Sequence, residues 1–239
     1  MLRAIVFDVG NTLHHVDHAW VADCITRHGH AADARAVQTA EYRAKAAIDE
    51  MFRAAAAGTD STRQRSYMEV VLDTLGVAAA LKTPIARALR TENDRVSLWR
   101  VQHDDTPAVL AALRARGLTL AVVSNADGRV AAALARSGIA DQFVTIVDSH
   151  VAGVEKPDPR IFQLALDACG IAPQEALYVG DIYEIDIVGA RNAGMDAVLM
   201  DPLGLYEGTI DCRRISCLNE LLALDPHAEQ PQLNADERR

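Results

Sequence analysis

Short apolar runs that alternate with helical patterns constrain the fold of this chain more than any other feature of its sequence. Five runs have the length and the β-branched content of buried strands, namely Arg3–Phe7, Leu118–Ser124, Phe143–Val147, Ala176–Val179 and Ala197–Met200. Helices are expected after Thr106-Pro107 and Asp158-Pro159, and a further one is expected from Asp186 to Gly194. This alternation predicts an α/β fold, a doubly wound parallel sheet with helices on both faces.

The segment between the first two runs has a different character. Residues 15–102 are rich in Ala, Arg and Glu, contain no convincing strand, and read as a series of amphipathic helices. Such a length exceeds any simple connection between a strand and a helix. The sequence therefore predicts a core made of residues 1–14 and 103–224 with an inserted helical domain at 15–102. The polar tail, 225–239, is expected to be disordered.

Composition excludes several classes of protein. Half of the 239 residues are apolar and 24% are charged, which is ordinary for a globular protein. The net charge of −9 and the lack of a basic stripe argue against a nucleic-acid partner. No apolar run approaches the roughly 18 residues of a membrane span. The chain enters its first strand without a signal-peptide pattern, so a cytoplasmic location is expected. The sequence favours no particular oligomeric state.

Polar residues fall at the carboxyl ends of the predicted strands. Asp8 follows the first strand, Ser124 and Asn125 end the second, and Asp181 follows the fourth. Lys156 lies just ahead of a predicted helix. Ligands of open α/β sheets bind at this edge, near the switch in strand order. Each residue alone has an ordinary structural explanation, but their common placement predicts a site.

The residues of this predicted site suit phosphoryl transfer. Asp8 can attack phosphorus and form an aspartyl-phosphate. Asp8 and Asp181 can hold Mg²⁺, which prefers few protein ligands and several waters, and Asp186 can orient that site. Lys156 offsets the negative charges, while the Ser124 hydroxyl can hold phosphate oxygens.

In this arrangement the sequence resembles the haloacid dehalogenase (HAD) superfamily of hydrolases over about residues 3–222. Four motifs occur in order, and they read Asp8-Val9-Gly10-Asn11-Thr12, Ser124, Lys156, and Asp181 with Asp186. The helical insert is similar in place and character to the α-helical cap of the family's first cap class.

The resemblance implies a Rossmann-like core and a Mg²⁺-dependent phosphatase that hydrolyses a small phosphorylated metabolite through an aspartyl-phosphate. It assigns catalysis to Asp8, Lys156 and Ser124. It assigns substrate binding to Ser124, Asn125, Lys156 and Thr12, and metal binding to Asp8, Asp181, Asp186 and the backbone carbonyl of Gly10.

Gly10 departs from the family pattern. Phosphatases of the family carry a second Asp at this position, where it protonates the leaving group and later activates water. The sequence offers His14, His15, Asp17 or a residue of the cap as replacements, because histidine titrates near neutral pH.

Three alternatives remain open. A dehalogenase would share the first motif, but such enzymes usually lack the acidic pair Asp181 and Asp186. A phosphonatase would need a cap lysine to form a Schiff base, and Lys45 is the obvious candidate, although nothing in its sequence surroundings marks it. The third alternative is a non-catalytic phosphate-binding protein. A mutase is disfavoured, since it would need the second Asp.

Overall fold

The computed structural model describes residues 1–53, 60–206 and 210–223, the side chains of 50–66 excepted. Its centre is a parallel six-stranded sheet in the order β5-β4-β1-β6-β7-β8. The strands are β1 (Ala4–Phe7), β4 (Thr119–Ser124), β5 (Thr145–Asp148), β6 (Ala176–Gly180), β7 (Asp196–Met200) and β8 (Arg213–Ile215). The first five overlap the five apolar runs of the sequence, and the predicted doubly wound α/β fold is confirmed.

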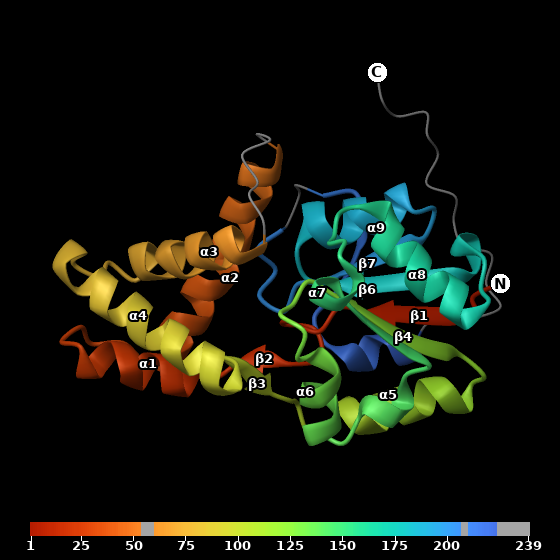
Figure 1. The fold of residues 1–239 in the computed structure, drawn as a ribbon, viewed down its shortest axis with the longest axis horizontal. Coiled ribbons are helices and arrows are strands. Elements are labelled where there is room, and N and C mark those ends of the chain that lie inside the picture. Colours follow the sequence, from red (N-terminus) through yellow and green to blue (C-terminus); the bar gives the residue numbers. More distant parts are fainter. Residues whose placement is uncertain (54–59, 207–209, 224–239) are drawn as a thin grey trace.

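Helices cover both faces of this sheet (Figure 1). Side chains alternate along a strand, so Ile5 and Phe7 of β1 join one apolar core while Ala4 and Val6 join the other. The first core packs against α5 (Thr106–Ala115) and α6 (Val130–Arg136), and the second against α8 (Pro159–Cys169) and α9 (Val188–Asn192). A short helix, α7 (Ser149–Ala152), follows β5. Because both faces are covered, β1 is completely buried.

Among the described residues, four helices lie between β2 (His15–Val16) and β3 (Trp99–Val101), and Figure 1 shows them gathered beside the sheet. They are α1 (His18–Arg27), α2 (Ala34–Arg53), α3 (Asp60–Thr74) and α4 (Ala79–Val96). They have an apolar core of their own, which includes Ile25, Leu72 and Leu89. The expectation that 15–102 holds no strand is wrong at both ends, because β2 and β3 pair antiparallel. Strands this short leave no periodic signal in a sequence.

Two further elements differ from expectation. The helix expected from Asp186 begins earlier, as a π-helical turn at Tyr183–Ile187 that continues into α9. The edge strand β8 was not predicted, since two of its three residues are exposed arginines. The predicted disorder of 225–239 lies outside the described residues. Among the helices of the described part, none is long and apolar enough to cross a membrane.

Candidate functional site

Three adjacent strands bring the predicted site residues together. Asp8 follows β1, Asp181 follows β6, and Ser124 is the last residue of β4. Since β1 lies between β4 and β6 and all three run parallel, their carboxyl ends meet at one edge of the sheet. All three side chains are buried and line one pocket.

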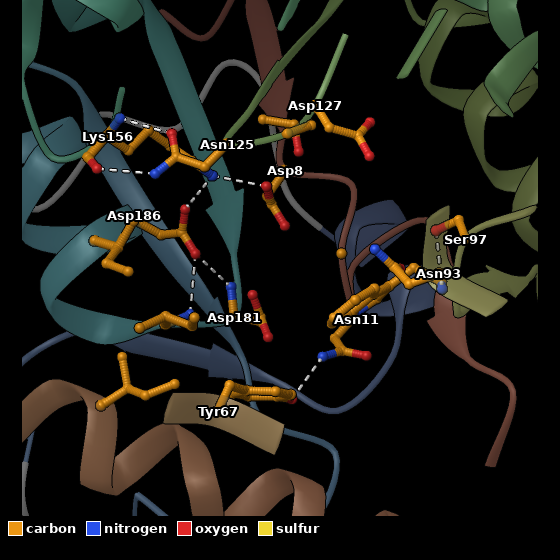
Figure 2. Close-up of a pocket in the computed structure, with 17 residues that line it drawn as sticks. Asp8, Asn11, Tyr67, Asn93, Ser97, Asn125, Asp127, Lys156, Asp181 and Asp186 are labelled. Atoms are coloured by element: carbon orange, nitrogen blue, oxygen red, sulfur yellow. Dashed lines mark hydrogen bonds and ion pairs between the residues drawn. The ribbon is translucent and has the colours of Figure 1, made fainter. Parts of the chain in front are cut away.

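Lys156 links the acidic side chains of this cluster (Figure 2). Its Nζ lies 2.7 Å from Oδ1 of Asp8 and 2.7 Å from Oδ1 of Asp186, and it donates to the Tyr178 hydroxyl at 2.9 Å. Burial alone would lower the pKa of Lys156, but the charges of Asp186 and Asp8 raise it above its ordinary value. The ammonium therefore stays charged and holds both carboxylates in place.

Asn125 positions the backbone of Lys156. Its side-chain amide donates to the Lys156 carbonyl at 2.9 Å and accepts from the Lys156 amide at 2.7 Å. This reciprocal pair ties the loop after β4 to the loop that carries the lysine. Asn125 also lines the pocket, where its side chain is within reach of a ligand.

Asp186 organises the loop after β6. Its Oδ2 accepts hydrogen bonds from the backbone amides of Asp181 and Ile182, both at 2.9 Å. The π-helical turn brings this carboxylate back onto the strand end, so a Cβ on Gly180 would lie 2.4 Å from Cγ of Asp186. Only glycine fits at position 180 for this reason. Turns of π-helix often occur at functional sites.

The three carboxylates form a compact acidic cluster. One oxygen from each of Asp8, Asp181 and Asp186 lies within 4.8 Å of the others. Burial raises the pKa of Asp8 to about 7, and the charges of Asp186 and Asp181 add to this while Lys156 opposes it. Burial likewise raises the pKa of Asp181. Both shifts reflect chiefly the burial of these carboxylates, and the neighbouring carboxylates add to them.

This donor set fits a hard divalent cation. Oδ2 of Asp8 and Oδ1 of Asp181 make no contact with another described side chain that would occupy them. Figure 2 shows both carboxylates facing the same cavity. Two carboxylates with room for waters match the way proteins bind Mg²⁺. Asp186 is committed to Lys156 and to backbone amides, so it can orient such a site more readily than ligate the ion.

The pocket continues from the cluster towards the helical segment. Its wall on that side is mainly apolar and aromatic, with some polar groups, and it is formed by Ile48, Tyr67, Asn93, Ser97 and Trp99. Gly10 lines the floor beside Asp8. Thr12 does not line the pocket; it is fully buried, and its hydroxyl has no hydrogen-bond partner among the described residues.

The sequence-predicted replacements for the missing acid point elsewhere. Nε2 of His14 lies 2.7 Å from the Ser137 hydroxyl, in contact with α6. His15 stacks on His103 with ring centroids 4.0 Å apart, and burial, helped by nearby positive groups, lowers its pKa to about 3. Asp17 caps α1 and pairs with an arginine of β3. None of the three lines the pocket.

Two buried charges of α2 reach the site and were not assigned from the sequence. Nζ of Lys45 lies 2.8 Å from Oδ2 of Asp181, and Oε1 of Glu41 accepts from the Asn11 side chain at 2.6 Å. The ion pair with Asp181 distinguishes Lys45 in the structure, although its sequence surroundings do not. The four-residue spacing of Glu41 and Lys45 places them on one helix face, but it does not indicate which groups that face contacts.

Comparison with known proteins agrees with this geometry. The fold and the cluster together define a doubly wound α/β protein with an acidic site at the carboxyl edge of its sheet. Residues 2–194 match the family model of the haloacid dehalogenase-like hydrolases, and the chain belongs to this family. It is 34% identical over 206 residues to haloacid dehalogenase-like hydrolase domain-containing protein 3 of Bos taurus, which covers 83% of this chain and 82% of that protein.

Two of the relatives with named activities are phosphatases. A phosphoserine phosphatase of Thermus thermophilus is 38% identical over 149 residues, which cover 62% of this chain and 58% of that protein. A glyceraldehyde 3-phosphate phosphatase of Methanopyrus kandleri is 31% identical over 204 residues, which cover 83% of each.

Solved structures share the fold. The HAD-hydrolase YfnB of Bacillus subtilis, bound to magnesium, has a TM-score of 0.66 at 19% identity, covering 93% of this chain and 97% of its own. L-2-haloacid dehalogenase of Xanthobacter autotrophicus, with chloropropionic acid covalently bound, has a TM-score of 0.57 at 21% identity, covering 92% and 97%. At these identities the likeness concerns the fold alone.

Proposed function

We propose that this protein is a Mg²⁺-dependent phosphatase that hydrolyses a small phosphorylated metabolite through a phosphorylated Asp8. One observation carries the proposal: Lys156 holds Oδ1 of Asp8 at 2.7 Å while the other carboxylate oxygen faces the pocket. A carboxylate fixed in this way is oriented for attack before the substrate arrives. The phosphatase names of two relatives support the same reaction class.

The reaction has two steps. In the first, Oδ2 of Asp8 attacks phosphorus, the phosphorus–oxygen bond to the substrate breaks, and the leaving oxygen takes the electron pair. In the second, water attacks the phosphorus, the bond to Asp8 breaks, and phosphate leaves. Lys156 offsets the charge of Asp8 and phosphate, and the Ser124 hydroxyl with the Asn125 amide holds phosphoryl oxygens.

The cation would be held by Asp8, Asp181 and the backbone carbonyl of Gly10, with Asp186 orienting the loop. When bound, it would offset the repulsion between the carboxylate and the phosphate. The donor chemistry of the cluster supports this assignment, since all of these ligands are oxygen atoms.

Residues 15–102 would act as a cap over a core formed by 1–14 and 103–224. Support comes from the pocket wall, to which Ile48, Tyr67 and Trp99 contribute from the helical segment. A cap that completes the pocket can exclude water and select the substrate. Thr12, which is fully buried in the loop after Asp8, would act by supporting that loop.

Release of phosphate from p-nitrophenyl phosphate tests the proposal. Activity is expected with Mg²⁺, is expected to vanish with excess chelator, and is expected to return when Mg²⁺ is restored. Phosphate release that persists in chelator would exclude the cation from the reaction. Phosphate binding without any turnover would favour a phosphate-binding protein.

A second candidate, phosphonate cleavage, is favoured by the position of Lys45 beside Asp181. Schiff-base formation requires an uncharged amine. Burial alone would lower the pKa of Lys45, but the charges of Asp181 and Glu41 raise it above its ordinary value. The charged amine favours the phosphatase. Borohydride trapping in the presence of a 2-oxoalkyl phosphonate separates the two, because only a phosphonatase would become modified at Lys45.

A further inference from the structure

The pocket has no carboxyl group at position 10, where Gly10 stands. An alcohol leaves phosphorus slowly unless its oxygen receives a proton. The point that a Cβ on Gly10 would occupy is 3.8 Å from Oδ2 of Asp8, so an acid at this position would stand beside the proposed nucleophile. Hydrolysis of an alkyl phosphate therefore needs a proton donor elsewhere in the lining of the pocket.

Most titratable side chains of the described lining are already committed. The acidic cluster is assigned to nucleophilic attack and to the cation, and Lys156 is held between two of its members. Asp127 pairs with Arg129, and hydrogen bonds from that guanidinium lower the pKa of the carboxyl, so it has no proton to give near neutral pH. Tyr67 is the remaining titratable side chain of the described lining. A phenol keeps its proton at neutral pH, because its ordinary pKa is about 10.

The hydroxyl of Tyr67 is oriented by Asn11, the residue after Gly10. Oε1 of Glu41 accepts from Nδ2 of Asn11 at 2.6 Å, and this contact fixes which end of the amide carries the nitrogen. The same Nδ2 donates to the Tyr67 hydroxyl oxygen at 3.4 Å, along the dashed line in Figure 2. The oxygen of the hydroxyl is thus an acceptor here, and among the described residues none accepts its proton. That proton is available to a ligand.

Tyr67 also lies on the side of the pocket where a leaving group would depart. It belongs to α3 and is 6% exposed, and Figure 2 shows it at the opposite end of the cavity from Asp8. Attacking and leaving oxygens are roughly in line at phosphorus, so the leaving oxygen faces away from Asp8. The ring of Trp99 packs near the ring of Tyr67, with centroids 6.1 Å apart, and helps to hold it there.

We propose that Tyr67 is the general acid of the phosphatase reaction and supplies the proton that Gly10 cannot. As Oδ2 of Asp8 bonds to phosphorus, the bond from phosphorus to the leaving oxygen breaks, and that oxygen keeps the electron pair and takes the Tyr67 proton. The hydrogen bond from Asn11 stabilises the resulting phenolate. In the second step the phenolate accepts a proton from the attacking water, which restores the phenol. This inference rests on the proposed function and adds a catalytic residue to it.

Two esters that differ in their leaving group test this in the full chain with Mg²⁺. p-Nitrophenyl phosphate releases a phenolate that departs readily, whereas benzyl phosphate has a similar ring but releases an alkoxide that needs a proton. The quantity compared is kcat/KM, which covers the steps up to departure of the leaving group. Tyr67→Phe should lower it about 100-fold for benzyl phosphate and less than about threefold for p-nitrophenyl phosphate.

Tyr42→Phe is the matched control. Tyr42 is also a buried tyrosine of the helical segment, at 4% exposure, but it does not line the pocket, so loss of its hydroxyl should change neither value. Gly10→Asp gives a second readout. Two acids that serve the same oxygen are not additive. Gly10→Asp should therefore raise the ratio of kcat/KM for benzyl phosphate to that for p-nitrophenyl phosphate by a larger factor in Tyr67→Phe than in wild type.

Wild type provides a measurement that needs no variant. Its kcat/KM for benzyl phosphate should show a solvent isotope effect in heavy water, because a proton moves as the alcohol leaves, and its kcat/KM for p-nitrophenyl phosphate should show none. Absence of the effect with benzyl phosphate would overturn the inference whether or not Tyr67→Phe folds.

Equal losses for the two esters in Tyr67→Phe would also overturn the inference, because a purely structural change does not distinguish the leaving groups. So would equal effects of Gly10→Asp in the two backgrounds. In either case phosphate release through Asp8 leaves the proposed function standing. A chain that releases phosphate from neither ester contradicts the proposed function and the inference together.

Discussion

The indole ring of Trp99 lies 3.5 Å from the position that a Cβ on Gly10 would occupy. The same position is 3.8 Å from Oδ2 of Asp8. Trp99 is held there because β3 pairs with β2, and its ring packs near Tyr67 with centroids 6.1 Å apart. The φ of Gly10 lies outside the left-handed region, so its backbone accepts a side chain. The place where a family phosphatase carries its acid is thus bordered by an indole.

This geometry predicts how an added acid would act. A positioned general acid contributes about 10²–10⁴ in rate and matters most for a poor leaving group. The double variant Gly10→Asp/Trp99→Ala is therefore compared with Trp99→Ala alone. The added acid should raise the ratio of kcat/KM for alkyl phosphates to kcat/KM for aryl phosphates at least about tenfold. Gly10→Asp alone should gain less, because the indole crowds the carboxylate. No gain for alkyl phosphates, with unchanged Mg²⁺ affinity and melting temperature, would mean that another group already supplies the proton.

The two acids after β6 should have separable effects. Asp186→Asn removes an orienting partner, for which a loss of Mg²⁺ affinity of about 10–100-fold is typical. Asp181→Asn removes a proposed ligand and should weaken Mg²⁺ binding by more than that. In chelator both variants should lower the free energy of unfolding by about 3–5 kcal/mol, because Asp181 pairs with the buried Lys45 and Asp186 pairs with the buried Lys156. Calorimetry measures Mg²⁺ binding, and urea unfolding measures stability. A loss of Mg²⁺ affinity in Asp186→Asn as large as that in Asp181→Asn would contradict these roles.

Sequence patterns predicted the parts of this protein that depend on local composition. The apolar runs at β1 and β6 are buried on both faces, and such strands are recognisable without any partner. Their parallel arrangement then places Asp8 and Asp181 at one edge. The rule for ligand sites in open sheets was enough to predict this cluster.

The remaining site residues depend on how distant segments pack. Lys45 approaches Asp181, and Trp99 approaches Gly10, only because the helical segment docks at one particular angle. Tyr178 belongs to a buried strand, and the sequence pattern predicts it to be a core residue, although its hydroxyl contacts Lys156. Side-chain direction across an interface is not encoded in local periodicity, so these contacts could not be predicted from the sequence.

Acid should destabilise the fold through His15. Its pKa is about 3 in the folded chain, against an ordinary value of 6.5, chiefly because it is buried. Below pH 6.5 the unfolded chain binds a proton that the folded chain does not bind, so stability falls as pH falls towards 3. The slope from this group approaches about 1.4 kcal/mol per pH unit. Between pH 7 and 4.5 the urea midpoint of His15→Gln should fall less steeply than that of wild type. His150 is exposed, so the control variant His150→Gln should match wild type. Parallel curves for all three proteins would contradict the assignment.

Shortening the helical segment should separate catalysis from selectivity. Val16 and Trp99 pair across β2 and β3, so a short turn can replace residues 18–97. Neither apolar core of the sheet contains a residue of this segment, and the shortened chain should therefore fold. It should hydrolyse aryl phosphates with Mg²⁺ but lose its ranking of phosphorylated metabolites. A shortened chain that keeps the wild-type ranking would show that the helical segment does not select the substrate.

The proposed mechanism requires Asp8 to become phosphorylated during turnover. Wild-type protein is mixed with Mg²⁺ and an aryl phosphate, quenched in acid and digested. The masses of the peptides are then measured by mass spectrometry. The peptide containing Asp8 should gain the mass of one phosphoryl group. Asp8→Asn barely changes the shape of the side chain, and it should not form this adduct. Its activity should be about a thousandth of wild type, because a covalent catalyst contributes several kcal/mol. An adduct on another residue, or Asp8→Asn activity above about a tenth of wild type, would contradict the account.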